Sequence, residues 1–265
     1  MKRGLADRQA HVTDPEHMRI DPRALLEDAY IDARRAAIDP ERAGVPVPGA
    51  PQLGGTAYLC AADADGLCVS LIQSNFLAFG SGVRVEDWGI NLTNRGASFT
   101  LDDTAVNVLA GAKLPLHTLI PAMAFKNERP WLLFGTRGAD GQPQTQMQIL
   151  SNTIDFGMNA QEAQDAMRWR GNSTYQEPSP DPVLLEGRFP QATRDQLAAM
   201  GHTIQLAEDY ADEMGHAAVI EIDDAGTRAA DQRRVAHDEF IAGQRDQPRV
   251  RSGDEAFRVY LAQGE

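Results

Sequence analysis

Thr56 is the residue of this chain whose setting points most directly to catalysis. It follows a loop rich in proline and glycine, residues 45–55, and it opens an apolar run over residues 56–62. Cleavage of the bond before Thr56 would free its α-amino group beside its own hydroxyl, and a neutral amine can accept the hydroxyl proton. A self-cleaving amidase requires this arrangement, although a Gly-Gly-Thr sequence also occurs by chance in many loops.

Two further segments hold residue types that fit such chemistry. Residues 135–141 are rich in glycine and lie at an expected strand-to-helix junction, where backbone N–H groups can face an anionic oxygen. Residues 115–118 place His117 beside Thr118 just before another expected strand. Each segment has an ordinary alternative, because such glycines often serve only the turn and such a polar pair is often a cap.

The bulk composition limits the class of protein. The 265 residues include 38 acidic and 25 basic side chains, for a net charge of −13. This length holds one large domain or two small ones with a hydrophobic core. The acidity argues against nucleic acid and anionic membranes as partners. No apolar stretch is long enough to span a bilayer and no signal peptide is visible, so we expect a cytoplasmic protein.

Cysteine and histidine usage predicts neither a disulfide framework nor a metal site. Cys60 and Cys68 flank the turn at residues 63–66, and we expect them to be free thiols. The six histidines show no paired ligand spacing, such as two histidines four residues apart on a helix. We therefore expect no metal.

The elements that must position these residues include several helices. Asp21 and Pro22 provide an N-cap and a first-turn proline, and the apolar spacing that follows predicts a helix over residues 22–38. Three more helices are expected, at residues 143–157, at 160–169 after the cap Asn159, and at 191–200 before Gly201. The apolar residues that fall on one face of the first of these are Met147, Leu150 and Ile154.

Two hairpins and two later strands make up the expected β-structure. Residues 56–62 and 67–75 flank a turn with Asp65-Gly66, and their nearly continuous apolar character predicts a sheet covered on both faces. The other expected strands are residues 119–126, 131–136, 203–207 and 217–223. The charged tail from residue 237 is expected to pack poorly. Because strands and helices are segregated rather than alternating, the fold class is α+β.

Five spaced segments together resemble the gamma-glutamyltranspeptidase family of N-terminal-nucleophile hydrolases. They are residues 56–66, 79–82, 115–121, 134–138 and 155–159, and residues 214–216 also fit. The resemblance runs from about residue 5 to residue 235 with the motifs in register. It implies a four-layer αββα sandwich and a proenzyme that cuts itself into a large and a small subunit, here at Gly55–Thr56.

The resemblance also implies roles for individual residues. Thr56 matches the nucleophile, which attacks the substrate carbonyl and forms an acyl-enzyme that water or an amine resolves. Ser74 matches a hydroxyl that assists the threonine. Gly138 and Ala139 match a glycine pair that forms the oxyanion hole, a role that needs only backbone N–H groups. The substrate is then a small amide, γ-glutamyl or another acidic acyl compound, and no cofactor is needed.

The substrate-binding positions depart from the family pattern. Thr118 keeps a hydroxyl where transpeptidases contact the substrate α-carboxylate, whereas His117 departs. Arg95 and Ser98 stand where the glutamyl α-amino group is bound, and a guanidinium would repel an ammonium and attract a carboxylate or carbonyl. This pattern resembles a divergent branch that includes oxamate amidohydrolase and some acylases. A non-glutamyl amidase is therefore the alternative function.

Family proenzymes have a longer portion before the cleavage site than the 55 residues here. We therefore expect residues 1–55 to be the end of the large-subunit region with its pro-loop, 56–236 the small-subunit catalytic region, and 237–265 a polar extension. The fold would be incomplete on the large-subunit side. The chain is then a fragment, a non-catalytic remnant, or a subunit whose partner is a large-subunit chain or a second copy. Because relatives are often exported, a periplasmic or extracellular location stays open for a full-length relative.

Overall fold

The computed structural model describes residues 2–36, 38–39, 41–42, 56–77, 79–171, 182–223, 226–231 and 257–261. The chain forms two compact units, each assembled from three separate stretches. Unit 1 comprises residues 1–55, 74–118 and 169–207, and unit 2 comprises residues 56–73, 119–168 and 208–265. None of the helices in the described part of the chain is long and apolar enough to cross a bilayer.

Unit 2 is built around a five-stranded antiparallel sheet with the strand order β11–β10–β6–β5–β12. At its centre, Phe134 of β6 lies opposite Ala122 on one neighbouring strand and Val219 on the other. The strand bounds are β5 Ala122–Lys126, β6 Arg129–Thr136, β10 Ala217–Asp223, β11 Gly226–Asp231 and β12 Phe257–Leu261.

The predicted hairpin over residues 119–136 is confirmed as β5 and β6. Its turn places Asn127 and Glu128 at φ of 51° and 64°, the pair of positive values that a two-residue turn between twisted strands requires. Strand β12 lies in the tail that we expected to pack poorly, yet it pairs with β5 along five residues. The charged composition of the tail as a whole concealed this strand from sequence reasoning, although four of its five residues are apolar.

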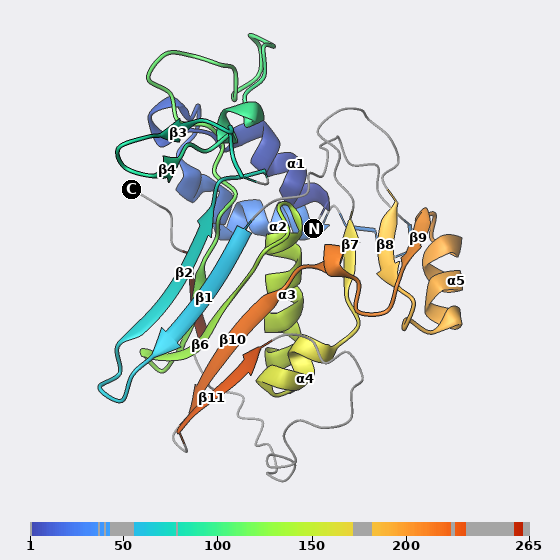
Figure 1. The fold of residues 1–265 in the computed structure, drawn as a ribbon. Helices are drawn as coiled ribbons and strands as arrows, with labels where there is room; N and C mark the ends of the chain where they lie inside the picture. Colours follow the sequence, from blue (N-terminus) through green and yellow to red (C-terminus); the bar gives the residue numbers. More distant parts are fainter. Residues whose placement is uncertain are drawn as a thin grey trace. The chain divides into compact units, whose positions relative to one another are not determined.

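Helices cover one face of this sheet and a hairpin covers the other (Figure 1). Helix α3, Gly141–Ile154, and helix α4, Ala160–Asp165, pack against the face that carries Leu132 and Phe134. The hairpin of β1, Thr56–Ala62, and β2, Cys68–Ser74, packs against the opposite face. Unit 2 therefore contains three consecutive layers, α, β and β, of the expected αββα order.

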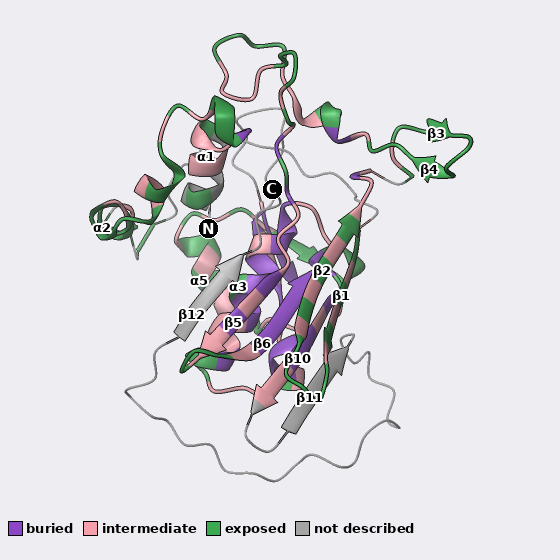
Figure 2. Ribbon diagram, turned by 90° about the vertical axis from the view of Figure 1, so that its left-hand side faces the viewer, coloured by how far each residue is buried: buried purple, intermediate pink, exposed green. Residues whose placement is uncertain are grey.

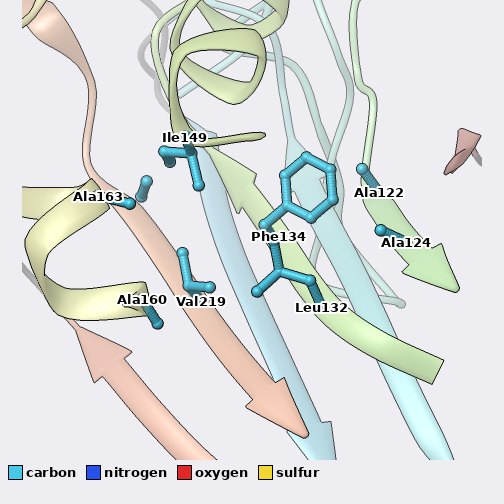
Figure 3. Packing of buried hydrophobic residues seen from close by; sticks show 9 residues of the cluster. Ala122, Ala124, Leu132, Phe134, Ile149, Ala160, Ala163 and Val219 are labelled. Atoms are coloured by element: carbon cyan, nitrogen blue, oxygen red, sulfur yellow. The ribbon is translucent and has the colours of Figure 1, made fainter. Parts of the chain in front are cut away.

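The core of unit 2 lies between the helices and the sheet. Ile149 of α3 and Ala160 and Ala163 of α4 meet Phe134 and Val219, and these side chains are at most 5% exposed (Figure 3). The small alanines let α4 approach the sheet closely. In Figure 2 the buried residues of this unit lie along β5, β6 and α3.

Helix α3 is confirmed, but the side that it buries is largely polar. Of the three residues that we placed on its apolar face, Leu150 packs against the core, but Met147 and Ile154 are each more than a third exposed, and Ile149 faces the core instead. Its buried polar side chains reach backbone carbonyls beyond the strand ends: Thr145 donates to Met214 O at 3.1 Å and Gln146 to Ile120 O at 2.8 Å. Buried carbonyls beyond the strand ends have no partner in the sheet and need other hydrogen-bond donors. This need explains why α3 buries amide and hydroxyl side chains.

The hairpin of β1 and β2 is confirmed with its turn, where Gly66 has φ +89° and the Asp63 carboxylate accepts from two backbone N–H groups. The expectation that both faces are covered is wrong for the described chain. Half-buried and exposed residues alternate strictly along both strands. Large apolar side chains on the uncovered face are Leu59, Val69 and Leu71.

Unit 1 combines short helices with two small sheets. The predicted helix over residues 22–38 is divided, because Glu27 is extended, with ψ 138°, between the 3-10 turn Pro22–Leu26 and helix α2; Asp21 does cap the turn. The other bounds are α1 Lys2–His11, α2 Asp28–Ala36, β3 Arg84–Val85, β4 Ile90–Asn91, β7 Trp169–Gly171, β8 Val183–Glu186, α5 Gln191–Ala199 and β9 Ile204–Ala207.

Several elements of unit 1 were not predicted. Helix α1 has no apolar periodicity to reveal it, and the three-residue strand β7 occupies the end of the helix expected over residues 160–169. The cap of that helix, Asn159, is confirmed by a reciprocal pair of hydrogen bonds with Glu162. Helix α5 ends as expected before Gly201, which has φ +93°.

Candidate active site

Thr56 is the first residue of β1, the strand that packs across β6 and β10. Strand β1 begins at the end of the sheet where β6 finishes (Figures 1 and 2). A close approach between the two strands depends on Gly135, because a Cβ there would lie 2.3 Å from the ring of Tyr58. The absence of a side chain at Gly135 thus lets the start of β1 lie close to the end of β6. Gly55 and the loop before it lie outside the described residues.

Tyr58 ties the two strands of the hairpin together. Its hydroxyl lies 2.9 Å from Ser70 Oγ on β2. Burial of the phenol raises the pKa of Tyr58 above its ordinary value, and the hydrogen bond with Ser70 opposes this change only in part. The phenol therefore stays neutral and fixes β1, and with it Thr56, against β2.

The loop after β6 contains the two residues predicted to bind the oxyanion. Gly138 has φ +130° and Ala139 has φ +48°, so both occupy backbone conformations that side chains disfavour. The turn is closed by the N–H groups of Gly141 and Gln142, which donate to the carbonyls of Gly138 and Ala139 at 2.8 and 3.0 Å. Within the described chain, no acceptor occupies the N–H groups of Gly138 and Ala139 themselves. The loop leads into α3, whose N-terminus carries partial positive charge.

A second loop, residues 214–216, packs against the loop of Gly138 and Ala139. A Cβ on Gly138 would lie 3.6 Å from Gly215 Cα, and a Cβ on Gly215 would lie only 2.6 Å from Arg137 O. The Arg137 N–H also donates to His216 O at 3.2 Å. The segment 214–216, singled out in the sequence, therefore lies against the proposed oxyanion loop.

Arg168 holds the second loop in place, and sequence reasoning missed it. This fully buried guanidinium donates to Gly215 O at 2.7 Å, to Met214 O at 3.3 Å and to Gln164 Oε1 at 2.8 Å. Thr145 on α3 donates to Met214 O as well. A buried charge must be hydrogen-bonded to be tolerated, and here the partners are the carbonyls behind the glycine loop.

A charged group lies on the surface beside these loops. Arg137 Nη2 donates to Asp212 Oδ2 at 2.7 Å and lies 3.0 Å from His216 Nε2. His216 also pairs with Asp212. Hydrogen bonds from His216 and then Arg137 lower the pKa of Asp212, but its side chain is 73% exposed, so solvent weakens this network.

The predicted substrate-binding residues lie in unit 1, and three of them come together. Arg95 Nη1 donates to Thr118 Oγ1 at 2.9 Å, and both residues are buried. Ser98 Oγ donates to the Arg95 carbonyl at 2.8 Å. His117 is exposed as a whole, yet partial burial of its imidazole and the positive charge of Arg95 lower the pKa of His117. Ser74, at the end of β2, accepts a hydrogen bond from the Phe76 N–H at 2.9 Å.

The two units thus hold different parts of the predicted site. Unit 2 has Thr56 and the loop of Gly138 and Ala139 at one end of its layers, and unit 1 has the group around Arg95 together with Ser74. No cluster of three histidine, cysteine, aspartate or glutamate side chains suited to a metal occurs among the described residues. Cys60 and Cys68 are free thiols, as expected.

Comparisons with known proteins agree with these motifs. A family model described as gamma-glutamyltranspeptidase matches residues 1–240. The chain is 40% identical over 226 residues to the glutathione hydrolase-like YwrD proenzyme of Bacillus subtilis, covering 85% of this chain and 42% of that protein. It is also 40% identical over 219 residues to the oxamate amidohydrolase proenzyme of Klebsiella pneumoniae, covering 83% of this chain and 41% of that protein. The chain thus spans about two fifths of the length of these relatives.

Solved structures show the same relationship. A cephalosporin acylase from Bacillus halodurans superimposes with a TM-score of 0.76 at 38% identity, covering 88% of this chain and 41% of that chain. An acivicin-inhibited gamma-glutamyltranspeptidase gives a TM-score of 0.57 at 25% identity, covering 68% of this chain and 99% of that chain. The predicted N-terminal-nucleophile hydrolase fold is confirmed by these similarities.

Proposed function

The chain belongs to the gamma-glutamyltranspeptidase family, and we propose that it carries the nucleophile of an amide hydrolase or acyltransferase that acts through Thr56. The proenzyme names of its relatives support a self-cleaving precursor. The observation that carries the proposal is that Thr56 starts β1 at the end of the sheet where β6 leads into the loop of Gly138 and Ala139, and that the N–H groups of these two residues have no acceptor within the described chain.

The chemistry follows from these two features. The α-amine of Thr56 accepts the proton of its own hydroxyl as Oγ attacks the substrate carbonyl. The N–H groups of Gly138 and Ala139 would then bind the oxyanion, and each such donor is typically worth about 3–4 kcal/mol of barrier. The ammonium next gives its proton to the departing amine, which leaves an acyl ester on Thr56. Water or a second amine attacks this ester and releases the threonine.

The substrate that we favour has an acidic acyl group without an ammonium. Arg95 supports this choice, because its buried guanidinium lies beside Thr118 and would repel the α-ammonium of a γ-glutamyl group. The names of an oxamate amidohydrolase and a cephalosporin acylase among the relatives also favour acyl groups other than γ-glutamyl. A γ-glutamyl substrate is the alternative, since one relative is called glutathione hydrolase-like.

Two matched chromogenic amides test the function and separate these alternatives. Glutaryl-p-nitroanilide carries a carboxylate but no ammonium, whereas γ-glutamyl-p-nitroanilide carries both. We expect faster hydrolysis of the glutaryl compound, loss of all turnover in Thr56→Ala, and a raised KM for the glutaryl compound in Arg95→Ala. Arg35→Ala, which removes an exposed arginine, is the control. Turnover that survives in Thr56→Ala would refute the nucleophile, and a preference for the γ-glutamyl compound would refute the substrate class.

We also propose that a large-subunit segment covers the exposed face of β1 and β2. The uncovered apolar residues Leu59, Val69 and Leu71 support this proposal, as do relatives about twice as long as this chain. The segment can belong to a separate chain, with a second copy of this chain as the alternative. Sedimentation of the purified 265-residue chain tests this point. A cooperative, active monomer would contradict the need for a partner, and an aggregated or molten product would favour a remnant without activity.

A further inference from the structure

Phe76 has a backbone conformation that a bulky aromatic residue seldom adopts. Its φ is +76°, and its side chain is buried, with 7% exposed. A residue other than glycine in such a conformation is strained, and the surrounding structure must enforce it. The residue follows Ser74 by two positions, and sequence reasoning gave it no role.

Hydrogen bonds on both sides of Phe76 enforce this conformation. The Asn94 carboxamide accepts from the Leu77 N–H at 2.9 Å and donates to Leu77 O at 3.3 Å. The Asn94 N–H donates to Asn75 O at 3.2 Å. Both chain neighbours of Phe76 are thereby attached to the residue that directly precedes Arg95.

The conformation places the aromatic ring against the guanidinium of Arg95. The Arg95 Cζ lies 4.9 Å from the centroid of the Phe76 ring, within the range of a cation–π interaction. Arg95 Nη1 also donates to Thr118 Oγ1 at 2.9 Å. A guanidinium that stacks on a ring face and donates to a hydroxyl has a defined plane, and a planar carboxylate binds along the edges of that plane.

The same residue also orients a second predicted site residue. The Phe76 N–H donates to Ser74 Oγ at 2.9 Å, and this bond fixes where the Ser74 oxygen lies. One strained residue therefore connects Ser74, Arg95 and, through the guanidinium, Thr118. Simple core packing would require neither the positive φ nor contact with a cation.

We propose that Phe76 is a positioning residue that holds the Arg95 guanidinium for recognition of a carboxylate or carbonyl on the acyl group of the substrate. The proposal rests on the proposed function for its substrate class. It assigns to Phe76 a specificity role that acts through Arg95, and it predicts an effect on substrate binding rather than on the bond-breaking step.

Three variants separate stacking from packing. Phe76→Leu keeps an apolar side chain but removes the π face, Phe76→Tyr keeps the π face, and Phe125→Leu, at a half-buried phenylalanine of β5, is the control. We expect Phe76→Leu to raise KM for glutaryl-p-nitroanilide about 3- to 30-fold, the range for a partly desolvated cation–π contact, with kcat within about twofold. Phe76→Tyr and Phe125→Leu should keep the KM of the unsubstituted protein.

A double variant and a binding measurement complete the test. If the ring acts through the guanidinium, Phe76→Leu should add little to the loss caused by Arg95→Ala. Calorimetric titration with glutarate reports on Arg95 without catalysis and should show the same loss of affinity in Phe76→Leu, while its urea midpoint shows that the fold is kept. Glutarate binding that depends on Phe76 in a protein without turnover would refute the proposed function but keep this inference. Additive losses, or glutarate binding that is absent or unchanged in Phe76→Leu, would overturn the inference.

Discussion

Among the glycines that pack against the proposed oxyanion loop, Gly215 should tolerate substitution by alanine least. Its φ of +86° and ψ of 152° fall in a region that is almost confined to glycine. A Cβ there would lie 2.6 Å from Arg137 O and 2.7 Å from Thr136 Oγ1. Arg137 O belongs to the same peptide group as the Gly138 N–H. Gly215→Ala should therefore rotate that peptide and turn one oxyanion donor away from its proposed position.

Gly66 provides a matched control for the cost of placing alanine in a backbone conformation with positive φ. It lies in the turn of the β1–β2 hairpin at φ +89°, and a Cβ there would meet nothing within 4 Å. Gly66→Ala should cost about 1–2 kcal/mol of unfolding free energy, the price of a Cβ in left-handed backbone. Gly215→Ala should lose the same amount plus about 1–3 kcal/mol for overpacking.

Urea unfolding and steady-state hydrolysis measure the two effects. We expect Gly215→Ala to be less stable than Gly66→Ala by roughly 1–3 kcal/mol. We expect its kcat to fall about 100-fold or more, the typical effect of removing one oxyanion donor, whereas Gly66→Ala keeps kcat. If the two variants have equal stability and equal kcat, the contact between Gly215 and the Arg137 peptide does not shape the site.

Three other perturbations have defined outcomes. Because burial raises the pKa of Tyr58, this residue stabilises the fold fully below about pH 10, its ordinary pKa. This contribution is lost as the pH rises further. In urea titrations at alkaline pH, Tyr58→Phe should therefore lose less stability than the unsubstituted protein does. Arg168→Met leaves the buried carbonyls of the second loop without their donor and should lower the unfolding free energy by about 2–5 kcal/mol, against less than about 0.5 kcal/mol for Arg35→Met on the surface. The lowered pKa of Asp212 gives stability that is present above its ordinary pKa and is lost as the pH falls through the lowered value. Because the side chain is exposed, Asp212→Asn should lower the unfolding free energy by less than about 1 kcal/mol at pH 7. The difference in unfolding free energy between the two proteins should vanish in acid and shrink in salt.

The sequence predicts correctly those elements whose turn or cap depends only on neighbouring residues. The turn at Asp65-Gly66 predicts the hairpin of β1 and β2, and the cap at Asn159 predicts the start of α4. Thr56 and Gly138 were found in the same way, because a strand start and a strand-to-helix turn are visible in the neighbouring residues. Their roles as nucleophile and oxyanion binder remain predictions.

Features that depend on contacts between distant segments could not be read from spacing. The apolar stripe of α3 suggested Met147 as part of a packed face, but the strand-end carbonyls require polar donors, so the helix buries amides and hydroxyls instead. Arg168 has its role only because the fold brings the carbonyls of residues 214 and 215 within hydrogen-bonding distance of its guanidinium. The positive φ of Phe76 has no local sequence signal, since asparagine rather than phenylalanine would be expected in such a conformation.

The most direct test of the central claim is the intact mass of the purified protein. If Thr56 becomes an N-terminal nucleophile, mass spectrometry should show two pieces that separate at Gly55–Thr56. Thr56→Ala should leave a single chain, and Thr56→Ser, which keeps a hydroxyl, should still be cut. An uncut chain that nevertheless hydrolyses amides would contradict the account.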